Sequence, residues 1–369
     1  MLKIIFKIFG KSGSNAIPHN INPLQVENIL IVRQHNQLGD MLCSVPLFAA
    51  IRKKFPKAHI TLVASPINYE ILFSDINPYI DKVITYSKAP LKNLLEFYKE
   101  LKNHKYQIGI VPSTVSISRT SHFINYFSGA KERVGVRSID DKYNSVEYLL
   151  NIKSDFKWDF KKLHQVERNL DVGRQIGCNL NESELNEVKI HLSDDENSYA
   201  ANFVDKNFPD RSRMIISFHP GAGKSANRWS KENFIELIKM INEKYGCYIL
   251  LTSGNIDKEI TDEIRSALKI CTVLENTPIR KVGAVIKLTD LYITNDTGTM
   301  HVAGGVDANV ISLFGPTHGY EWAPRGKNKI FIQSASDNIN DISVEKVFEV
   351  TNTFLQTAHS GNKEVSLGA

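Results

Sequence analysis

The sequence is poor in cysteine and has no long apolar run. Its 369 residues include four cysteines, none of them in a C-x-x-C pair or near histidines spaced for zinc. This scarcity argues against a disulfide scaffold or a zinc site and predicts reduced, buried thiols in a cytoplasmic protein. No apolar run approaches the ~20 residues that a membrane-spanning helix needs. No G-x-G-x-x-G follows a predicted strand and no metal-ligand cluster stands out, so we expect neither a cofactor nor a metal.

A strong excess of one charge is also missing. The 45 lysines and arginines nearly balance the 40 aspartates and glutamates, which leaves a net charge of +5, and both signs are scattered along the chain. This mild basicity favours anionic small molecules or an anionic membrane face, and we expect no nucleic-acid partner. Apolar residues make up 42% of the chain, as is ordinary for a globular protein.

The N-terminal segment, MLKIIFKIFGK, alternates Lys3, Lys7 and Lys11 with isoleucine and phenylalanine. It is too short for a secretory signal and lacks a cleavage site. One interpretation is a basic amphipathic turn that lies on the inner face of the cytoplasmic membrane. The other is a loosely docked terminus. Together with a polar linker, this segment forms residues 1–23.

Short β-branched runs alternate with amphipathic segments through the rest of the chain. The predicted strands are residues 28–32, 59–64, 107–111, 133–136, 214–218, 247–252, 291–294 and 309–314, and the predicted helices are residues 40–54, 91–102, 117–127, 163–176, 231–245, 257–268 and 282–287. Such alternation is typical of an α/β protein with doubly wound parallel sheets. The length fits two domains, which we place at residues 24–195 and 196–369 with a cleft between them. Pro46 should kink the helix at 40–54 or delay its start.

The most informative segment is residues 291–317, LYITNDTGTMHVAGGVDANVISLFGPT. A buried strand runs into Asn295-Asp296-Thr297-Gly298, and a helix then begins. A helix start at the carboxyl edge of a sheet offers free N–H groups and a positive dipole end to a phosphate or diphosphate. Asp296 does not suit a bare anion site and would bind sugar hydroxyls or a cation. Alternatively, Asp296 or Thr297 is an ordinary N-cap.

Two further loops follow predicted strands. In the first, residues 33–40, Gly39 permits a tight turn and Asp40 is either a general base or a helix N-cap. The second, residues 219–230, contains Gly223-Lys224-Ser225, which resembles a P-loop. The P-loop pattern needs a glycine five residues before Gly223, where this chain has Phe218. Its helix should start only after Ser230, so Lys224 and Arg228 are better interpreted as cations for a diphosphate.

These three loops, in this order and spacing, resemble glycosyltransferase family 9, the ADP-heptose:lipopolysaccharide heptosyltransferases. The resemblance spans roughly residues 28–325. The matching residues are Arg33, Gly39, Asp40, Pro46, Arg52, Phe55-Pro56, His219-Pro220-Gly221-Ala222, Arg228-Trp229, Asn295-Asp296-Thr297-Gly298, Met300-His301-Val302-Ala303 and Leu313-Phe314-Gly315-Pro316-Thr317. The resemblance implies a GT-B fold, with the acceptor in the N-terminal domain and the nucleotide-sugar donor in the C-terminal one. It also implies an inverting, metal-independent transfer, here of a heptose from ADP-heptose to a lipopolysaccharide core or related lipid-linked glycan.

The resemblance gives roles to single residues. It makes Asp40 the general base, and it expects the donor diphosphate and the nearby sugar at the loop that holds Asp296, Thr297, Gly298 and His301. The family often has a lysine where this chain has Asn227, so either Lys224 or Arg228 stands in for it or phosphate binding is weaker here. A family glutamate for the nucleotide ribose corresponds either to Asp257 or to Glu259.

Residues expected on the acceptor side are Arg33, Gly39 and Arg119. Arg119, Lys131, Arg133 and Arg137 either face an anionic acceptor or form an ordinary solvated surface. Two other classes of function remain open at this point. A P-loop-like nucleotide hydrolase would need Gly-Lys-Ser to open a helix. A non-catalytic sugar-nucleotide-binding protein would keep the C-terminal loops without needing Asp40.

Overall fold

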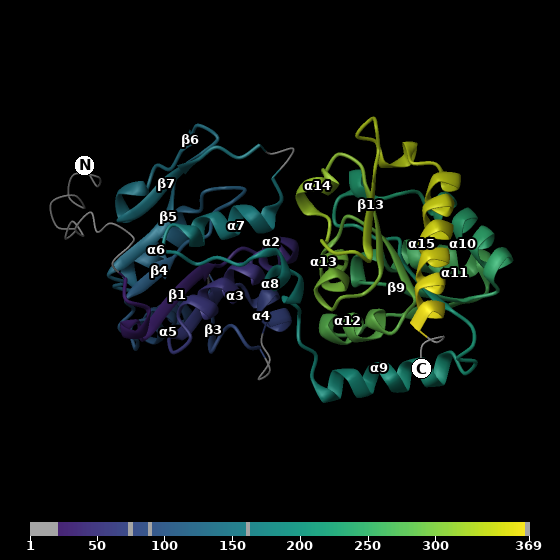
Figure 1. Cartoon of the computed structure of the whole chain (residues 1–369), viewed down its shortest axis with the longest axis horizontal. Coiled ribbons are helices and arrows are strands. Elements are labelled where there is room, and N and C mark those ends of the chain that lie inside the picture. Colours follow the sequence, from purple (N-terminus) through teal and green to yellow (C-terminus); the bar gives the residue numbers. More distant parts are fainter. Residues whose placement is uncertain (1–20, 73–76, 88–90, 160–162, 366–369) are drawn as a thin grey trace. The chain divides into compact units, whose positions relative to one another are not determined.

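The chain forms two compact units, residues 1–191 and residues 192–369, in the computed structural model (Figure 1). The structure describes residues 21–72, 77–87, 91–159 and 163–365. The expected domain boundary at residues 195/196 lies four residues beyond the observed division. The Lys3–Lys11 pattern lies outside the described residues. Within the described ranges, no helix combines the length and the apolar character needed to cross a membrane.

Unit 1 contains a seven-stranded sheet with the order β3-β2-β1-β4-β5-β6, and β7 also pairs with β5. Its strands are β1 (Asn28–Arg33), β2 (His59–Ala64), β3 (Lys82–Thr85), β4 (Ile108–Ile110), β5 (Glu132–Ile139), β6 (Lys142–Tyr143) and β7 (Ile152–Phe156). All pairings are parallel except that of β6 with β5. The chain order reverses between β1 and β4, which is where such sheets usually bind ligands.

The helices of unit 1 are α2 (Leu38–Leu42), α3 (Val45–Lys54), α4 (Pro66–Leu72), α5 (Leu91–Leu101), α6 (Arg119–Phe127), α7 (Gln165–Arg174) and α8 (Glu182–Glu187). The single helix predicted at residues 40–54 is therefore wrong. It is divided into α2 and α3 at Cys43-Ser44, because Pro46 lies in the first turn of α3, where its missing N–H costs no hydrogen bond. The structure thus shows the delayed helix start that Pro46 suggested.

Unit 2 contains a six-stranded, fully parallel sheet with the order β10-β9-β8-β11-β12-β13. Its strands are β8 (Ile215–His219), β9 (Tyr248–Thr252), β10 (Cys271–Leu274), β11 (Leu291–Asn295), β12 (Val310–Phe314) and β13 (Lys329–Gln333). In the central register Ile293 lies opposite Phe218 on one side and Ile311 on the other. Its helices are α9 (Asp194–Asn207), α10 (Lys231–Tyr245), α11 (Lys258–Leu268), α12 (Ile279–Lys287), α13 (Gly298–Gly305), α14 (Gly319–Trp322) and α15 (Val344–Val365). These two parallel α/β sheets confirm the predicted fold class.

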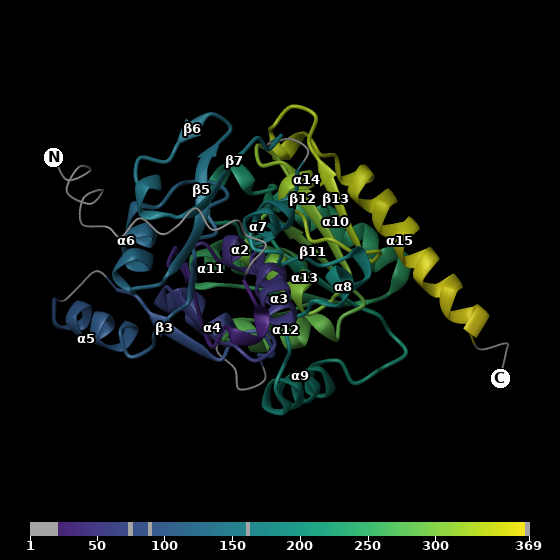
Figure 2. The same cartoon turned by 60° about the vertical axis from the view of Figure 1, so that its left-hand side comes forward.

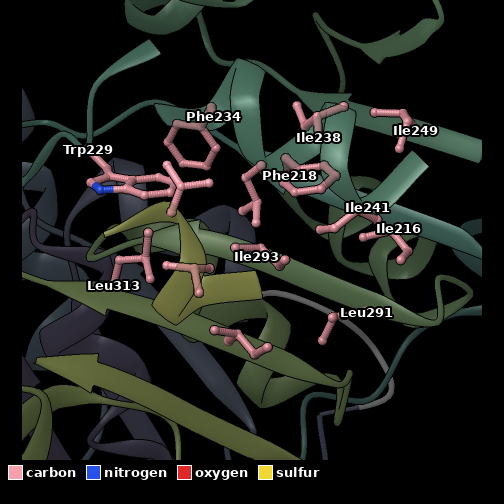
Figure 3. Close-up of a cluster of buried hydrophobic side chains, with 14 of the residues drawn as sticks. Ile216, Phe218, Trp229, Phe234, Ile238, Ile241, Ile249, Leu291, Ile293 and Leu313 are labelled. Atoms are coloured by element: carbon pink, nitrogen blue, oxygen red, sulfur yellow. The ribbon is translucent and has the colours of Figure 1, made fainter. Parts of the chain in front are cut away.

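A hydrophobic cluster on one face of the unit 2 sheet anchors the loop of residues 219–230, between β8 and α10 (Figure 3). Trp229 is fully buried there, and its ring meets Phe234 edge to face with ring centres 5.1 Å apart. The indole Nε1 donates a hydrogen bond to the backbone oxygen of Ile342 at 2.9 Å. Because a fully buried indole is costly to move, it fixes the polar residues that precede it in the sequence.

The four cysteines are free, as predicted, although Cys271 is only partly buried. Burial raises the pKa of Cys178 to about 12 and the pKa values of Cys247 and Cys271 to about 11. These thiols are therefore protonated at neutral pH and poor nucleophiles.

Candidate functional site

Three loops meet at the carboxyl edge of the unit 2 sheet, after the neighbouring strands β8, β11 and β12. Asn295, the last residue of β11, is fully buried and joins two of them. Its side-chain amide donates to the backbone oxygen of Pro220 at 2.9 Å, and its Oδ1 accepts from the backbone N–H of Trp229 at 3.2 Å. Asn295 therefore holds both ends of the β8–α10 loop against β11.

A polar triad of Asn227, Asp296 and Thr317 takes one residue from each loop. Asn227 lies in a short 3₁₀ helix, η4 (Ser225–Asn227), and is almost fully buried. Its Nδ2 donates to Asp296 Oδ2 at 2.9 Å and to Thr317 Oγ1 at 3.3 Å. Its Oδ1 is buried without a hydrogen-bond partner in the described residues. An orphaned acceptor of this kind costs free energy unless a ligand or solvent reaches it, which marks the triad as a candidate binding surface.

Burial raises the pKa of Asp296 above the ordinary aspartate value. The hydrogen bond from Thr317 and the positive charge of Lys224 oppose this shift only partly. Asn227, which also donates to this carboxylate at 2.9 Å, is a neutral amide and adds no positive charge. Asp296 is therefore a hydrogen-bond acceptor with little local charge compensation, which suits sugar hydroxyls better than phosphate.

Helix α13 begins beside this triad. The side chain of Thr297 caps it by accepting from the backbone N–H of Met300 at 3.4 Å. Thr297, and not Asp296, is thus the N-cap that the sequence left open. Gly298 is the first helical residue, and the first N–H groups of the helix have no partner within it. The start of α13 therefore offers donors and a positive dipole end to an anion. His301, on the same helix, is nearly buried, and its ring meets Trp322 edge to face at 6.3 Å.

The two expected cations of the second loop are held differently. Lys224 is exposed and close enough to act on the pKa of Asp296. Arg228 is half-buried, and its Nε donates to the backbone oxygen of Ala222 at 2.8 Å, so part of its guanidinium holds the loop. Helix α10 begins only after Ser230, whose hydroxyl caps it by accepting from Asn233 N–H at 3.2 Å. This late helix start contradicts a P-loop.

A buried pair lies beneath the same loop. His219 Nε2 is 3.6 Å from Asp257 Oδ2, and both side chains are less than one tenth exposed. Burial lowers the pKa of His219 despite the carboxylate, and its Nδ1 donates to the backbone oxygen of Thr252 at 3.0 Å. Asp257 Oδ1 is buried without a hydrogen-bond partner in the described residues, whereas Glu259 is exposed on α11. A Cβ at Gly221 would lie 2.1 Å from the Asp257 carboxyl carbon, so the loop can approach this carboxylate only with glycine there.

In unit 1 the loop of residues 33–40, which contains Arg33 and Asp40, follows β1. Asp40 lies in the first turn of α2, whose N-cap position is Gln37, so Asp40 is not the N-cap that the sequence allowed. Gly39 is a regular residue of α2 and not a tight turn. The Asp40 carboxylate accepts from Arg33 at 3.3 Å and is 19% exposed. Arg33 is itself buried and also donates to the backbone oxygens of Asp40 and Pro112. Arg33 thus holds the orientation of Asp40 from the buried side, and the carboxylate remains partly exposed to solvent.

A hollow of about 600 Å³ opens in unit 1 beside this turn. Gln34, His35 and Gln37 line it from the loop after β1, and Tyr86 lines it from the end of β3. Ser118, which caps α6, and Thr120 complete this part of the lining. Amides, hydroxyls and one aromatic ring are the groups that bind sugars, and the volume is that of an ordinary ligand site.

The basic residues expected on the acceptor side are mostly engaged elsewhere in unit 1. Arg119 opens α6 and donates to Ser145 Oγ at 3.2 Å. Arg137 forms an exposed pair with Asp155, which lowers the pKa of Asp155 to about 2. Arg133 donates to backbone oxygens, among them that of Ala130 at 2.9 Å. Lys131 is exposed, and the other three cations each have a partner of their own.

The structure adds residues that sequence reasoning missed. The hydroxyl of Thr317, which belongs to a motif without an expected role, completes the triad. The hollow residues lie either at the variable positions of the 33–40 loop or outside any motif. The buried state of Asp257 distinguishes it from Glu259, which spacing alone left equal. Within the described ranges no group of three or more His, Cys, Asp or Glu side chains is placed to hold a metal ion.

Comparison with known proteins identifies the family. Residues 94–351 match the model of glycosyltransferase family 9 (heptosyltransferase), which is well over half of the chain. Lipooligosaccharide heptosyltransferase 2 of Campylobacter jejuni is 23% identical over 78% of this chain and 81% of its own length. Lipopolysaccharide heptosyltransferase 2 of Escherichia coli is 24% identical over 76% of this chain and 80% of its own length.

Solved structures agree on the fold. A family 9 glycosyltransferase from Veillonella parvula superposes with a TM-score of 0.77 at 19% identity, covering 91% of this chain and 99% of its own. The E. coli ADP-heptose lps heptosyltransferase II gives a TM-score of 0.72 at 22% identity, covering 90% of this chain and 99% of its own. The fold is therefore GT-B, as the resemblance implied. The chain belongs to glycosyltransferase family 9.

Proposed function

We propose that this glycosyltransferase moves a heptose from ADP-heptose to a lipopolysaccharide core or related glycan, with inversion and without a metal. Support for the donor comes from relatives, since E. coli heptosyltransferase structures with TM-scores of 0.69 and 0.67 hold ADP and ADP-2-deoxy-2-fluoro heptose. Support for the acceptor comes from the relatives' names, which specify lipopolysaccharide or lipooligosaccharide.

The observation that carries the proposal is the arrangement at the carboxyl edge of unit 2. The start of α13 offers N–H donors to an anion, and Lys224 supplies a nearby positive charge. Beside them, Asp296 and Asn227 present oxygen acceptors that would repel a phosphate and attract hydroxyls. An anion site bordered by hydroxyl acceptors fits a molecule that joins a diphosphate to a sugar.

In the proposed reaction Asp40 is the general base. The acceptor oxygen attacks the anomeric carbon while the bond from that carbon to the diphosphate oxygen breaks, and the hydroxyl proton passes to the Asp40 carboxylate. Arg33 fixes the orientation of this carboxylate through its 3.3 Å contact. The leaving diphosphate takes the electron pair, and Lys224, Arg228 and the start of α13 stabilise its charge.

Asp257 is our candidate for binding the nucleotide ribose. Its buried, unpartnered Oδ1 can accept from a hydroxyl, and Gly221 permits the close approach of the loop above it. Glu259 is exposed and lacks this arrangement. Replacing Asp257 with asparagine should weaken binding of ADP more than binding of pyrophosphate, and Glu259→Gln provides the matched control.

The decisive experiment is a screen of nucleotide sugars by thermal stabilisation and by mass spectrometry of the products. ADP-heptose should raise the melting temperature and yield a heptosylated acceptor together with ADP. Stabilisation without transfer to any glycan acceptor would support a non-catalytic sugar-nucleotide-binding protein instead. Stabilisation by a different nucleotide sugar would keep the transferase but change its donor.

A further inference from the structure

A continuous row of aromatic rings connects the hollow of unit 1 to the protein surface. Tyr86 lines the hollow, and Phe97 of α5 follows, with ring centres 5.1 Å apart. Tyr98 lies 5.1 Å beyond Phe97 and meets Phe127 of α6 at 6.2 Å. Helices α5 and α6 lie next to each other in unit 1 (Figure 2).

The outer end of this row is apolar and open to solvent. Phe127 is 43% exposed, and its ring also contacts Phe123 at 6.1 Å and Tyr126 at 5.6 Å. Leu95 is 66% exposed and lies one helical turn before Tyr98, on the same side of α5. We call Leu95, Tyr98, Phe123, Tyr126 and Phe127 the aromatic ridge.

Positive charge borders the aromatic ridge. Lys99, Lys102 and Lys105 are exposed along and after the last turn of α5, and Lys131 is exposed just after α6. The backbone N–H of Lys131 donates to the backbone oxygen of Tyr106, so the segments that follow the two helices lie together. The α5 carboxylates do not neutralise these lysines, because Glu96 pairs with Lys92 and Glu100 with Lys82.

We propose that the aromatic ridge docks on the surface of an anionic lipid bilayer. Aromatic and leucine side chains insert at the boundary between headgroups and acyl chains, and lysines on long apolar stems reach anionic headgroups from there. The lysine border is what selects a bilayer over a neutral apolar partner, since it complements negative lipid charge. A second copy of this chain would present the same positive border and be repelled.

Docking at this place also explains why the aromatic row runs to the hollow. This step rests on the proposed function, in which the acceptor glycan is linked to lipid. A ridge seated in the headgroup layer would hold the Tyr86 end of the hollow close to the membrane surface, where the sugar end of such an acceptor emerges. The membrane contact would then raise the local concentration of acceptor without adding any contact to its sugar.

The first test is sedimentation of the full chain with vesicles. Vesicles of phosphatidylcholine with phosphatidylglycerol should bind the protein, vesicles of phosphatidylcholine alone should bind it weakly, and added salt should reduce the binding. The double variant Leu95→Ser with Phe127→Ser should lower binding by ~10-fold or more. The control Ile256→Ser with Leu288→Ser removes two other exposed apolar side chains, 70% and 45% exposed, and should leave binding unchanged.

A fluorescent variant locates the contact. Phe127→Trp should show a blue shift with anionic vesicles, whereas Ile256→Trp should show none. Deletion of Met1–Lys11 separates the N-terminal segment from the ridge. If that deletion abolishes vesicle binding while the ridge variants bind normally, the proposal is wrong. Concentration-dependent dimers that disappear in the Leu95/Phe127 variant would likewise overturn it and assign the ridge to self-association.

Transfer to a soluble, lipid-free acceptor separates this proposal from the proposed function. The ridge variants should retain normal kcat and KM with that acceptor and lose activity only with acceptor embedded in vesicles. If the wild type transfers to neither acceptor but still binds vesicles through the ridge, the proposed function fails and the docking surface stands. If it transfers to both while the ridge variants match it in both, the docking surface fails alone.

Discussion

Two carboxylates, Asp40 and Asp296, lie after strands on opposite sides of the chain reversal in their sheets and have different surroundings. Each follows a strand at the reversal of the chain order, β1 in unit 1 and β11 in unit 2. Asp40 has a guanidinium partner, Arg33, at 3.3 Å. Asp296 has a neutral amide partner, Asn227, at 2.9 Å, and burial raises its pKa.

The difference shows how the same topology supports two kinds of chemistry. A carboxylate held by a buried arginine keeps one orientation, as a positioned base requires. A carboxylate held by an amide and a hydroxyl is suited to exchanging hydrogen bonds with a ligand.

Replacing Asp40 with asparagine tests whether this carboxylate of unit 1 is the general base. Asparagine keeps the size of the side chain but cannot accept a proton, so kcat should fall ~100-fold or more while donor affinity persists. The melting temperature should also fall, because the buried Arg33 loses its charged partner, although the amide oxygen can still accept its hydrogen bond. Initial rates and thermal unfolding on one preparation measure both. A folded Asp40→Asn protein with near-normal kcat would return Asp40 to a structural role.

Removing both cations of the second loop tests the anion site of unit 2. Lys224→Ala with Arg228→Ala should weaken donor binding by ~1–3 kcal/mol for each charge-assisted hydrogen bond that the diphosphate no longer receives. Calorimetric titration with ADP measures the change in affinity. The single variants separate the two effects. Arg228→Ala should lower stability more than Lys224→Ala, because Arg228 holds the Ala222 oxygen whereas Lys224 is exposed. Unchanged affinity in the double variant would place the diphosphate elsewhere.

Giving Asp296 a charged partner should make it resemble Asp40. Asn227→Lys places an ammonium where the amide now donates, and the pKa of Asp296 should fall. In the wild type the raised pKa means that ionised Asp296 lowers stability as the pH rises from about 4, the ordinary aspartate value. The variant should be free of this cost and gain stability with pH relative to the wild type, by about 1.4 kcal/mol per pKa unit removed.

The matched control for that experiment is Asn227→Met, because methionine is similar in length to lysine and has no charge. Both variants disturb the buried position of Asn227, but only the lysine should change the pH dependence. Urea unfolding between pH 4 and 7 distinguishes them. If the free energy of unfolding changes with pH in the same way in both variants, a charge at position 227 does not alter the pKa of Asp296.

Much of this architecture was predictable from the sequence. Strands such as β8, β11 and β12 are continuous apolar runs that end in glycine or polar residues, and α10 has both an N-cap serine and an apolar stripe. Strands β3, β6, β7, β10 and β13 were missed because polar or charged residues interrupt or flank their apolar positions, as in the IKSDF of β7. Their conformation comes from pairing with neighbouring strands, which no local pattern records.

The candidate site was only partly predictable, for the same reason. Motifs and spacing indicated Asp40, Lys224 and the Asp296–His301 loop. They did not reveal that Asn227 binds Asp296, which is 69 residues away along the chain, or that Arg33 lies behind Asp40. The expected turn at Gly39 was wrong because glycine in an R-x-x-x-x-x-G-D pattern also fits a helix start. Contacts between loops depend on strand order, and strand order is a property of the fold.

The smallest effect is expected for substitution of Arg119, which tests whether acceptor binding in unit 1 depends on positive charge. Arg119 precedes Thr120 of the hollow in sequence, but its Nε donates to Ser145 on the surface. The lining of the hollow, in the described residues, contains no Asp, Glu, Lys or Arg. Arg119→Ala should therefore change KM for the acceptor by less than about threefold, as is usual for a surface substitution. The companion variant Thr120→Ala should raise KM more, because it removes the hydroxyl of a lining residue. If instead Arg119→Ala raises KM strongly and added salt abolishes the difference between the two proteins, the acceptor carries a negative charge that Arg119 recognises. The neutral lining would then bind only part of the acceptor, and the contrast between the two edges would have to include charge recognition in unit 1 as well.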